Sequence, residues 1–332
     1  MAQVASLRRV CRPVPRRWAL VLVGVACGHA TAEPVPLLPA PGEVVARATP
    51  VAVEGTVGLG SRRIASEVEE PSALVASVRH PGVLWTLGDS GTAATVFGLD
   101  RRGAVVARLH VQGVVNVDWE ELAIDAEGGL YIADLGNNAN TRRDLRVHRV
   151  MEPEALGDHH VTPVDAIHIA YADQRAFPDP AALNFDAEAV VHDGTTLWVW
   201  TKHRSDNWTT AYRLPAVWPD DLAVLSPMGT FDLGPHPVDA TGRLTAASLS
   251  PDGQWLALLA YHGLWVLPRP ADGVSWWTQT PTVHRLDVVR AGQIEAVAWY
   301  AGGLVLLNER KRWWFLAEPW TASVGFPPEE VE

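Results

Sequence analysis

The sequence predicts an all-β fold, a single β-propeller of six blades in which each blade is a four-stranded antiparallel sheet. Two observations predict it. A unit of short apolar strands separated by glycine-containing turns recurs along the chain, most clearly in residues 116–150, 184–215 and 243–267. No stretch shows the sustained periodicity of an amphipathic helix, which disfavours a parallel α/β fold.

The spacing of the units predicts the number of blades. Aligning the units on Glu120 gives equivalent positions in four others, at Ser72, Glu188, Thr245 and Glu295. The steps between them are 48, 68, 57 and 50 residues, which suits four strands per step but not a regular WD-type array. Five units are visible, and we expect residues 51–70 and the tail after Trp313 to supply parts of a sixth. Six blades are therefore favoured over seven.

The N-terminus has the features of an export signal in their usual order. Five arginines precede the apolar run 18–27, and Ala30-Thr31-Ala32 has the form of a cleavage site. Residues 1–32 are thus predicted to be a signal peptide rather than a short buried helix, and the protein is expected to be periplasmic or extracellular. The alternative is a lipid anchor at Cys27, because Val25-Ala26-Cys27 weakly resembles a bacterial lipoprotein box.

Residues 33–65 are rich in Pro, Ala and Val, which predicts an extended linker or a ring-closing segment. We expect the β-propeller domain to cover residues 66–326. Apolar residues make up 48% of the chain and the mean hydropathy is +0.03, values typical of a packed globule. No run after the signal is long enough to span a membrane, and a monomer is expected.

Charge and cysteine content exclude several functions. Removal of residues 1–32 takes away five of the 27 basic residues and none of the 38 acidic ones, so the formal charge changes from -11 to -16. Such an acidic surface repels phosphate backbones, and nucleic acid is not an expected partner. Cys11 and Cys27 both fall within the signal, which excludes a disulfide or a thiolate metal site in the mature chain. No phosphate-cradling glycine motif is present, so no nucleotide cofactor is expected.

The chain has 15 tryptophans, most of them in predicted strands. We expect them to pack between blades rather than to form a sugar-stacking surface, because aromatic side chains suit a half-buried sheet face. In Trp276-Trp277 and Trp313-Trp314 the two neighbours would point to opposite faces of a strand. One member of each pair is therefore expected to be exposed.

Several motifs carry a resemblance to a known group of proteins. They are H-P-G-V-L-W-T-L-G-D-S-G, V-D-W-E-E-L-A, I-A-D-L-G-N-N, D-A-E-A-V-V, W-T-K, L-S-P-D-G and I-E-A-V-A. In order and spacing they resemble a family of uncharacterised secreted bacterial β-propellers, similar to the phytase-like and NHL/SMP-30-type six-bladed propellers. The resemblance covers roughly residues 70–312 and implies a fold rather than an activity. The Gly88-Asp89-Ser90-Gly91 stretch is interpreted as a turn, not as a protease nucleophile.

Acidic residues stand at the start of several predicted inner strands. Because side chains alternate along a strand, we expect Asp118, Glu120 and Leu122 on one face and Glu121 and Ala123 on the other. Inner strands of a propeller surround one axis, so equivalent residues of different blades should meet at one mouth of the channel. The residues expected to meet are Glu120, Glu188 and Glu295, with Asp134 and Asn308 at the ends of the following strands.

Carboxylates that converge need a cation, a proton or a basic side chain between them. The oxygen-rich set suits calcium, which the resemblance to calcium-holding propeller lactonases and phosphotriesterases also implies. The alternative is that each glutamate only accepts backbone hydrogen bonds in its own blade.

Two classes of function follow from this reading. The favoured one is a binding or scaffold protein of the cell envelope, with a small ligand, a glycan or an envelope protein as its partner. The alternative is a calcium-dependent hydrolase of the phosphoesterase or lactonase type, with Lys202 or His203 as weak catalytic candidates. The first is favoured because a nucleophile, a base and an orienting group cannot be placed together from the sequence.

Overall fold

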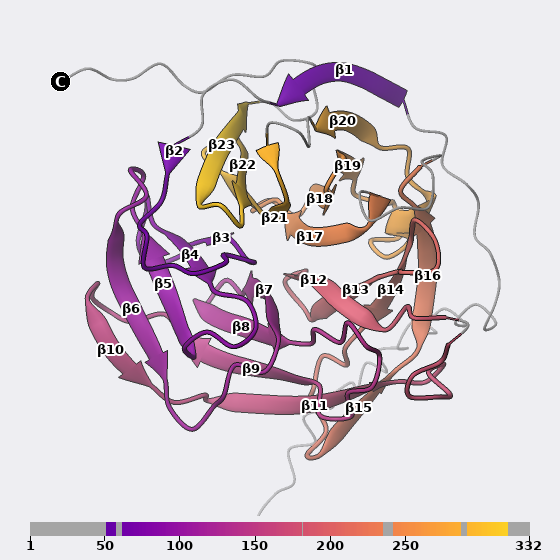
Figure 1. Cartoon of the computed structure of the whole chain (residues 1–332), viewed down its shortest axis with the longest axis horizontal. Coiled ribbons are helices and arrows are strands. Elements are labelled where there is room, and N and C mark those ends of the chain that lie inside the picture. Colours follow the sequence, from indigo (N-terminus) through magenta and orange to yellow (C-terminus); the bar gives the residue numbers. More distant parts are fainter. Residues whose placement is uncertain (1–50, 58–61, 181, 235–241, 287–290, 318–332) are drawn as a thin grey trace, which may run out of the picture. The chain divides into compact units, whose positions relative to one another are not determined.

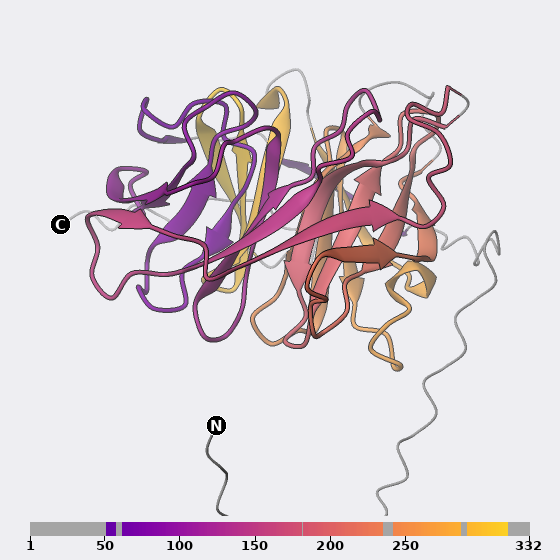
Figure 2. The ribbon, with the colours of Figure 1, turned by 90° about the horizontal axis from the view of Figure 1, so that it is seen from below.

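The strands in the described part of this chain pair into five sheets arranged around a common axis (Figure 1). The computed structural model describes residues 51–57, 62–180, 182–234, 242–286 and 291–317. Within these ranges one strand of each sheet lies nearest the axis and the others lie further out (Figure 1), and Figure 2 shows the same sheets after a quarter turn. The fold is therefore a β-propeller of five blades. In the same ranges no helix is long and apolar enough to span a membrane.

The blades are numbered in chain order. Blade 1 contains β3 (Val75–Ala76), β4 (Leu84–Leu87), β5 (Thr95–Leu99), β6 (Val105–Val111) and β10 (Asp158–Val161). Blade 2 contains β7 (Trp119–Ile124), β8 (Gly129–Asp134), β9 (Arg146–Met151), β11 (Asp165–Tyr171) and β15 (Leu222–Leu225). Blade 3 contains β12 (Asp186–His192), β13 (Leu197–Lys202), β14 (Trp208–Arg213) and β16 (Pro227–Asp232).

The last two blades include the N-terminal strands. Blade 4 contains β17 (Leu244–Leu249), β18 (Trp255–Ala260), β19 (Gly263–Pro268), β20 (Thr282–Leu286) and β1 (Val51–Val57). Blade 5 contains β21 (Ile294–Tyr300), β22 (Gly303–Asn308), β23 (Arg312–Ala317) and β2 (Arg62–Arg63). A short 3-10 helix, η2 (Trp276–Thr278), lies between β19 and β20.

The prediction of six blades was wrong, because both chain ends add strands to sheets that already exist. β2 pairs antiparallel with β23 and so completes blade 5, which closes the ring. β1 pairs with β20 at the outer edge of blade 4. The described parts of the segments expected to build a sixth sheet thus belong to blades 4 and 5. The signal peptide predicted over residues 1–32 lies outside the described residues.

Neighbouring blades exchange strands at their outer edges, which the prediction of four antiparallel strands per blade did not include. β10 precedes the outer strand of blade 2 but pairs in parallel with β6, the outer strand of blade 1. β15 joins blade 3 to blade 2 in the same way, and β1 joins blade 5 to blade 4. At the corresponding place between blades 3 and 4 the chain forms η2, whose Trp277 packs against Gly229 of β16. An exchanged segment therefore covers the outer edge of four blades among the described residues.

Short turns with local polar contacts connect the first two strands of the blades. In blade 2, Asp125 Oδ1 accepts hydrogen bonds from the backbone N–H of Glu127 at 3.0 Å and of Gly129 at 2.7 Å. Gly128 between them has a φ of 83°, a conformation that glycine adopts without steric cost. The Asp-Gly and Gly-Gly turns of the sequence thus fix the length of these hairpins.

Four inner strands carry a shift of register at the same place. The residues left without a partner in the first hairpin are Glu120, Glu188, Thr245 and Glu295. These are the positions that the alignment of the units made equivalent. Such a β-bulge interrupts the alternation of side chains along the strand.

Because of this bulge, the predicted alternation of side chains along β7 was wrong. Trp119 and Leu122, three residues apart, lie in the same apolar cluster between blades 1 and 2. With strict alternation they would face opposite sides. Leu122 therefore does not share a face with Glu120.

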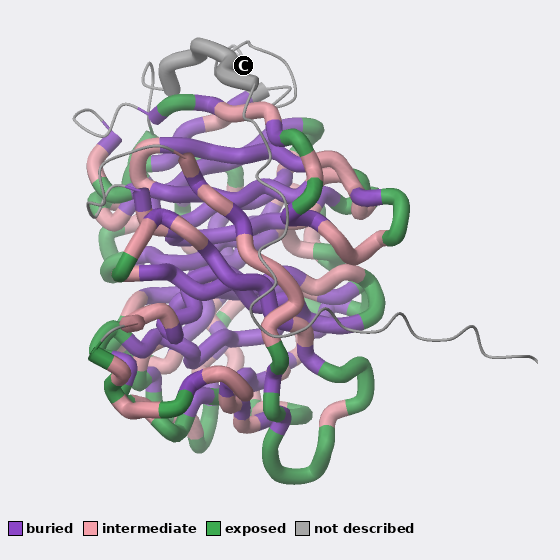
Figure 3. Tube along the Cα trace, turned by 90° about the vertical axis from the view of Figure 1, so that its right-hand side faces the viewer, coloured by how far each residue is buried: buried purple, intermediate pink, exposed green. Residues whose placement is uncertain are grey.

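Five apolar clusters fill the seams between blades, one for each seam. Buried residues follow the sheets and exposed ones gather in the connecting loops (Figure 3). Apolar positions of the repeat units occupy these clusters. Buried ones are Leu122, Ile132, Val190, Val199, Leu256, Val297 and Leu306, while Leu249 is partly buried.

The tryptophans pack between blades, as predicted. Trp85, Trp198, Trp200, Trp265 and Trp299 are buried in these clusters, and Trp255 packs against one of them.

The expectation of one exposed member in each tryptophan pair was wrong. Trp313 and Trp314 are both buried because blade 5 has a neighbour on each side, and each ring enters a different seam. Trp276 and Trp277 lie in a helical turn rather than a strand, so both rings reach the same seam.

The seam between blades 3 and 4 provides a test of the core. Leu256 is fully buried, so Leu256→Ala is expected to lower the free energy of unfolding by about 2 to 5 kcal/mol. Leu249 is only partly buried, and Leu249→Ala should cost distinctly less. Chemical denaturation of both variants measures the difference, and equal losses would contradict the assigned register.

A buried histidine predicts how stability depends on pH. Burial first, and then the charge of Arg146, lower the pKa of His148 to about 4. The unfolded chain takes up this proton near pH 6.5 while the folded protein does not, so stability is lost as the pH falls from about 6.5 towards 4. The loss should be on the order of 2 kcal/mol. In His148→Gln the slope over this range should become shallower, whereas the exposed control His160→Gln should keep it.

Candidate functional site

One end of the central channel collects most of the charged groups near the axis. Each inner strand begins there, and the second strand of each blade ends there, since Trp119 pairs with Asp134 and Asp186 pairs with Lys202. We refer to this end of the axis as the channel mouth. Loops of several blades meet at it, so residues far apart in sequence come together.

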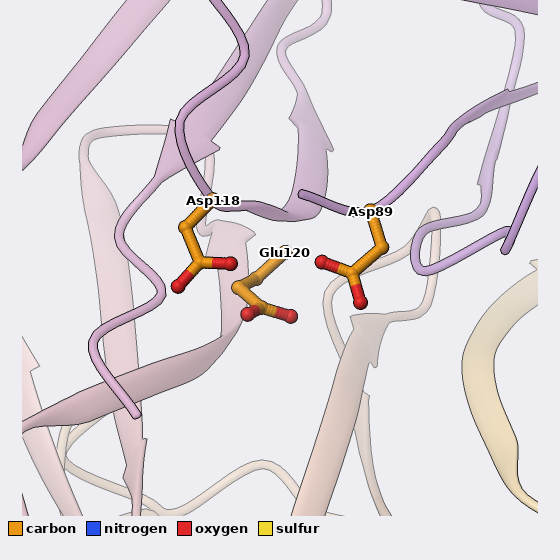
Figure 4. Close-up of side chains that lie close together, drawn as sticks. All are labelled: Asp89, Asp118 and Glu120. Carbon is orange, nitrogen blue, oxygen red and sulfur yellow. The ribbon is translucent and has the colours of Figure 1, made fainter. Parts of the chain in front are cut away.

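Three carboxylates from two blades form the first group at the mouth. Asp89 lies in the loop between β4 and β5, Asp118 immediately precedes β7, and Glu120 is the bulged residue of β7 (Figure 4). One oxygen of each carboxylate lies within 4.8 Å of an oxygen of the other two. We call Asp89, Asp118 and Glu120 the first carboxylate group.

Asn116 fixes the loop that carries Asp89. Its Nδ2 donates hydrogen bonds to the carbonyl oxygens of Gly88 at 3.0 Å and Asp89 at 2.9 Å, and to Thr92 Oγ1 at 3.0 Å. Its Oδ1 accepts a hydrogen bond from the backbone N–H of Trp119 at 3.0 Å. A single buried amide thus ties the blade 1 loop to the start of β7.

A second carboxylate group shares one member with the first. It consists of Glu120, Asp186 and Glu188, whose oxygens also lie within 4.8 Å of one another, and all three residues are buried. Asp186 accepts a hydrogen bond from the backbone N–H of Asn137 at 2.6 Å and forms an ion pair with Arg204. Glu188 Oε1 lies 2.8 Å from Lys202 Nζ. Protein cations therefore compensate two members of the second group.

The first group has no such compensation among the described residues. No described side chain or backbone N–H donates a hydrogen bond to the Glu120 carboxylate, and no described basic group lies in ion-pair contact with Asp89, Asp118 or Glu120, although Glu120 is only 6% exposed. Burial, followed by the charges of Glu188 and Asp89, raises the pKa of Glu120 well above its ordinary value. Burial and then Asp89 raise the pKa of Asp118 to about 6. In ionised form this group requires a positive charge from elsewhere.

A close approach of the chain completes the wall around the first group. The backbone N–H of Gly136 donates to the carbonyl oxygen of Asp118 at 3.1 Å. A Cβ at Gly136 would overlap the carboxylates of Asp118 and Glu120. The D-L-G-N-N motif therefore serves the mouth twice, through this glycine and through the contact of Asn137 with Asp186.

The other residues predicted for a metal site occupy the surroundings of these groups. Asp134 lies next to Asp118, whose backbone N–H it accepts at 3.1 Å, and forms an ion pair with Arg142 at 2.9 Å. Asn308 donates to the carbonyl oxygen of Ala291 at 2.5 Å and accepts from the backbone N–H of Arg312 at 2.8 Å. Both polar groups of Asn308 thus serve the loops of its own blade.

Glu295 lies on the side of the mouth formed by blades 4 and 5. It accepts a hydrogen bond from the Tyr261 hydroxyl at 2.8 Å, and Gln293 Nε2 contacts it at 3.4 Å and Glu309 at 3.0 Å. Its charge contributes to the raised pKa of Glu188, so the two glutamates face the same channel. Burial and then Glu295 raise the pKa of Glu309 to about 7. The structure brings Glu120 and Glu188 into one group and places Glu295 beside it.

The two weak catalytic candidates are both held by neighbouring side chains. Lys202 is bound to Glu188. Burial lowers its pKa, but the combined attraction of Glu188, Tyr261, Glu295 and Asp186 outweighs burial and raises the pKa well above the ordinary value. The His203 ring nitrogens lie 2.8 Å from Asp206 Oδ1 and 2.9 Å from Thr210 Oγ1. Lys202 therefore stays protonated, and His203 fixes the loop that carries Lys202 and Arg204.

Sequence reasoning missed Asp89 as a site residue and placed Glu121 away from the axis. Asp89 was interpreted only as part of a turn, which it also is, since its Oδ1 accepts from the backbone N–H of Ser90. Glu121 is fully buried and accepts hydrogen bonds from the backbone N–H groups of Leu122 at 3.0 Å and Ala247 at 3.2 Å. Ala247 belongs to blade 4, which is not adjacent to blade 2. The Glu121 side chain therefore reaches across the centre of the ring, below the mouth.

Comparison with solved structures supports the fold. The chain is similar to the major allergen Mala s 1 of Malassezia sympodialis, with a TM-score of 0.52 and 10% identity over 82% of this chain and 99% of that chain. A 6-phosphogluconolactonase-like protein of Bacteroides fragilis gives a TM-score of 0.38 and 12% identity over 76% of this chain and 71% of that one. Hydrazine synthase of Kuenenia stuttgartiensis gives 0.36 and 12%, over 75% and 96% of the two chains. At 10% identity the similarity to Mala s 1 concerns the fold alone, and no argument rests on the other two.

No protein-family model matches the chain, and no curated protein matches its sequence. The resemblance to phytase-like and NHL/SMP-30-type propellers therefore stays a prediction.

The wall at Gly136 can be tested by adding one methyl group. In Gly136→Ala the new Cβ must displace Asp118 or Glu120, so we expect a loss of stability of about 1 to 3 kcal/mol. Thr141→Ala changes an exposed position of the same loop and serves as the control. Denaturation curves of both variants measure the effect, and wild-type stability of Gly136→Ala would show that the carboxylates do not stand against this glycine.

Proposed function

We propose that this protein is an exported β-propeller that binds ligands at its channel mouth through one divalent cation held by Asp89, Asp118 and Glu120. The observation that carries the proposal is the Glu120 carboxylate, which is buried among other carboxylates and has no hydrogen-bond donor or basic partner among the described residues. A buried carboxylate in this position stays ionised only when a cation joins it.

Calcium is the metal that these donors favour. The group offers carboxylate oxygens only, and calcium takes six to eight oxygen ligands, whereas zinc and copper favour nitrogen or sulfur. Three carboxylates supply at most six oxygens, so water or a bound ligand would complete the shell. Hydroxyl or carboxylate oxygens of a small molecule, a glycan or an envelope protein are suited to that place.

The binding function is favoured over the calcium-dependent hydrolase. A hydrolase needs a base or nucleophile free to act on the substrate. Lys202 is engaged with Glu188, and both His203 ring nitrogens contact neighbouring side chains. Export is a further part of the proposal and rests on the basic, apolar and Ala-x-Ala order of residues 1–32.

Calcium-dependent stability tests the proposed function. Added at about 100 times its dissociation constant, calcium should stabilise the protein by about 2.7 kcal/mol, and a chelator should remove this gain. Glu120→Gln should abolish the calcium effect, because it removes one of the three carboxylates that hold the ion. It should leave the metal-free protein at least as stable as wild type, because a neutral amide at this buried position needs no counter-charge. Thermal unfolding with and without calcium measures both.

Glu154→Gln, an exposed change of equal charge away from the mouth, is the matched control and should keep the full calcium effect. A melting temperature of the wild type that is indifferent to calcium would overturn the proposal. An equal calcium response in wild type and Glu120→Gln would move the metal to another place.

A further inference from the structure

The two carboxylate groups at the channel mouth have the layout of a two-cation centre. Each contains three carboxylates whose oxygens lie within 4.8 Å of one another, and Glu120 belongs to both. A carboxylate shared in this way is the arrangement that bridges two metal ions about 3.5 to 4 Å apart. The groups differ in one respect, since only the second contains carboxylates already paired with basic side chains of the described chain.

Lys202 occupies the second group in a fixed position. Its side chain is 8% exposed, and its Nζ lies 2.8 Å from Glu188 Oε1. The same Nζ lies 5.5 Å from the centre of the Tyr261 ring, within the range of a cation–π contact. Because the ammonium is buried between a carboxylate and an aromatic face, it is part of the site and not a surface charge.

We propose that the Lys202 ammonium holds the position of a second cation, so that the channel mouth takes one divalent ion where its carboxylates alone would take two. The inference rests on the proposed function, because it assumes the first ion at Asp89, Asp118 and Glu120. Lys202 is thus a residue that sets metal stoichiometry. Its single charge compensates Glu188 and leaves Glu120 to the metal.

The proposal defines what happens when the ammonium is removed. Without Lys202, Glu188 becomes a second buried carboxylate without a partner, next to Glu120. Arg204 remains on Asp186 and compensates that residue only. A divalent ion can then bind between Glu120 and Glu188, which restores the positive charge and adds one more. The variant is therefore a latent two-metal site.

The decisive experiment counts calcium ions per chain by titration calorimetry and by metal analysis after gel filtration. We expect one ion in the wild type and two in Lys202→Met. The control is Lys311→Met, which changes the only other lysine of the chain, a half-buried residue of blade 5 whose Nζ contacts the carbonyl oxygen of Ser66. This control should bind one ion with wild-type affinity.

A second pair of variants tests the proposal without relying on the folding of Lys202→Met. Glu188→Gln alone should still bind one ion, with an affinity within about threefold of wild type, because Glu188 serves Lys202 and not the first ion. The double variant Lys202→Met, Glu188→Gln removes both charges together and should return the count to one.

The outcomes separate the inference from the proposed function. One ion in both the wild type and Lys202→Met, or a loss of more than tenfold in affinity in Glu188→Gln, would overturn the inference and leave the proposed function in place. No ion in the wild type but one in Lys202→Met would overturn the proposed function and support the role of Lys202. No ion in either protein would end both.

Discussion

The arrangement of the mouth depends on one backbone feature, the β-bulge at the start of the inner strands. Because the bulge breaks strict alternation, the consecutive residues Glu120 and Glu121 do not simply face opposite seams. The first joins the carboxylates at the mouth, and the second reaches across the ring to the backbone of blade 4. The same bulge in three other blades turns Glu188, Thr245 and Glu295 out of the ladder at equivalent places. One local irregularity, repeated in four blades, therefore produces the polar channel mouth, and in blade 2 it also directs Glu121 to the backbone of blade 4.

The mouth compensates its acidic residues unevenly. Asp134 has Arg142, Asp186 has Arg204, and Glu188 has Lys202. Glu121 instead relies on backbone N–H groups, which satisfy its oxygens without a counter-charge. A buried carboxylate left with neither kind of partner costs several kcal/mol in ionised form. An ionised Glu120 would therefore lower the free energy of unfolding unless a ligand supplied the missing charge. Sites of that kind are where proteins bind ions and ligands.

Much of the fold could be predicted from the repeat itself, and the features that could not be predicted have physical reasons. The alignment on Glu120 found the bulged positions, because acidic residues before an apolar strand mark the same step in each unit. The number of blades was not predictable from unit counting, since a strand such as β2 adds to an existing sheet without any change in its own sequence. Asp89 was missed for a related reason. It reaches Glu120 only through ring geometry and the hydrogen bonds of Asn116, and neither leaves a trace in local sequence.

The exchanged strands give the ring a direction. β10, β15 and β1 each pair with the blade that precedes the one their chain segment leads into, and η2 packs on blade 3 in the same way. A blade therefore cannot leave the ring without uncovering the outer edge of the blade before it. In the described residues the junction from blade 5 to blade 1 has no such overlap and is bridged by the chain running from β2 to β3. In the described residues the ring therefore has four junctions overlapped by an exchanged segment and one junction without such an overlap. A pulling force or a thermal opening of the ring is expected to act first at the junction of blades 5 and 1. The two carboxylate groups lie on blades 1 to 3, whose junctions are overlapped by β10 and β15.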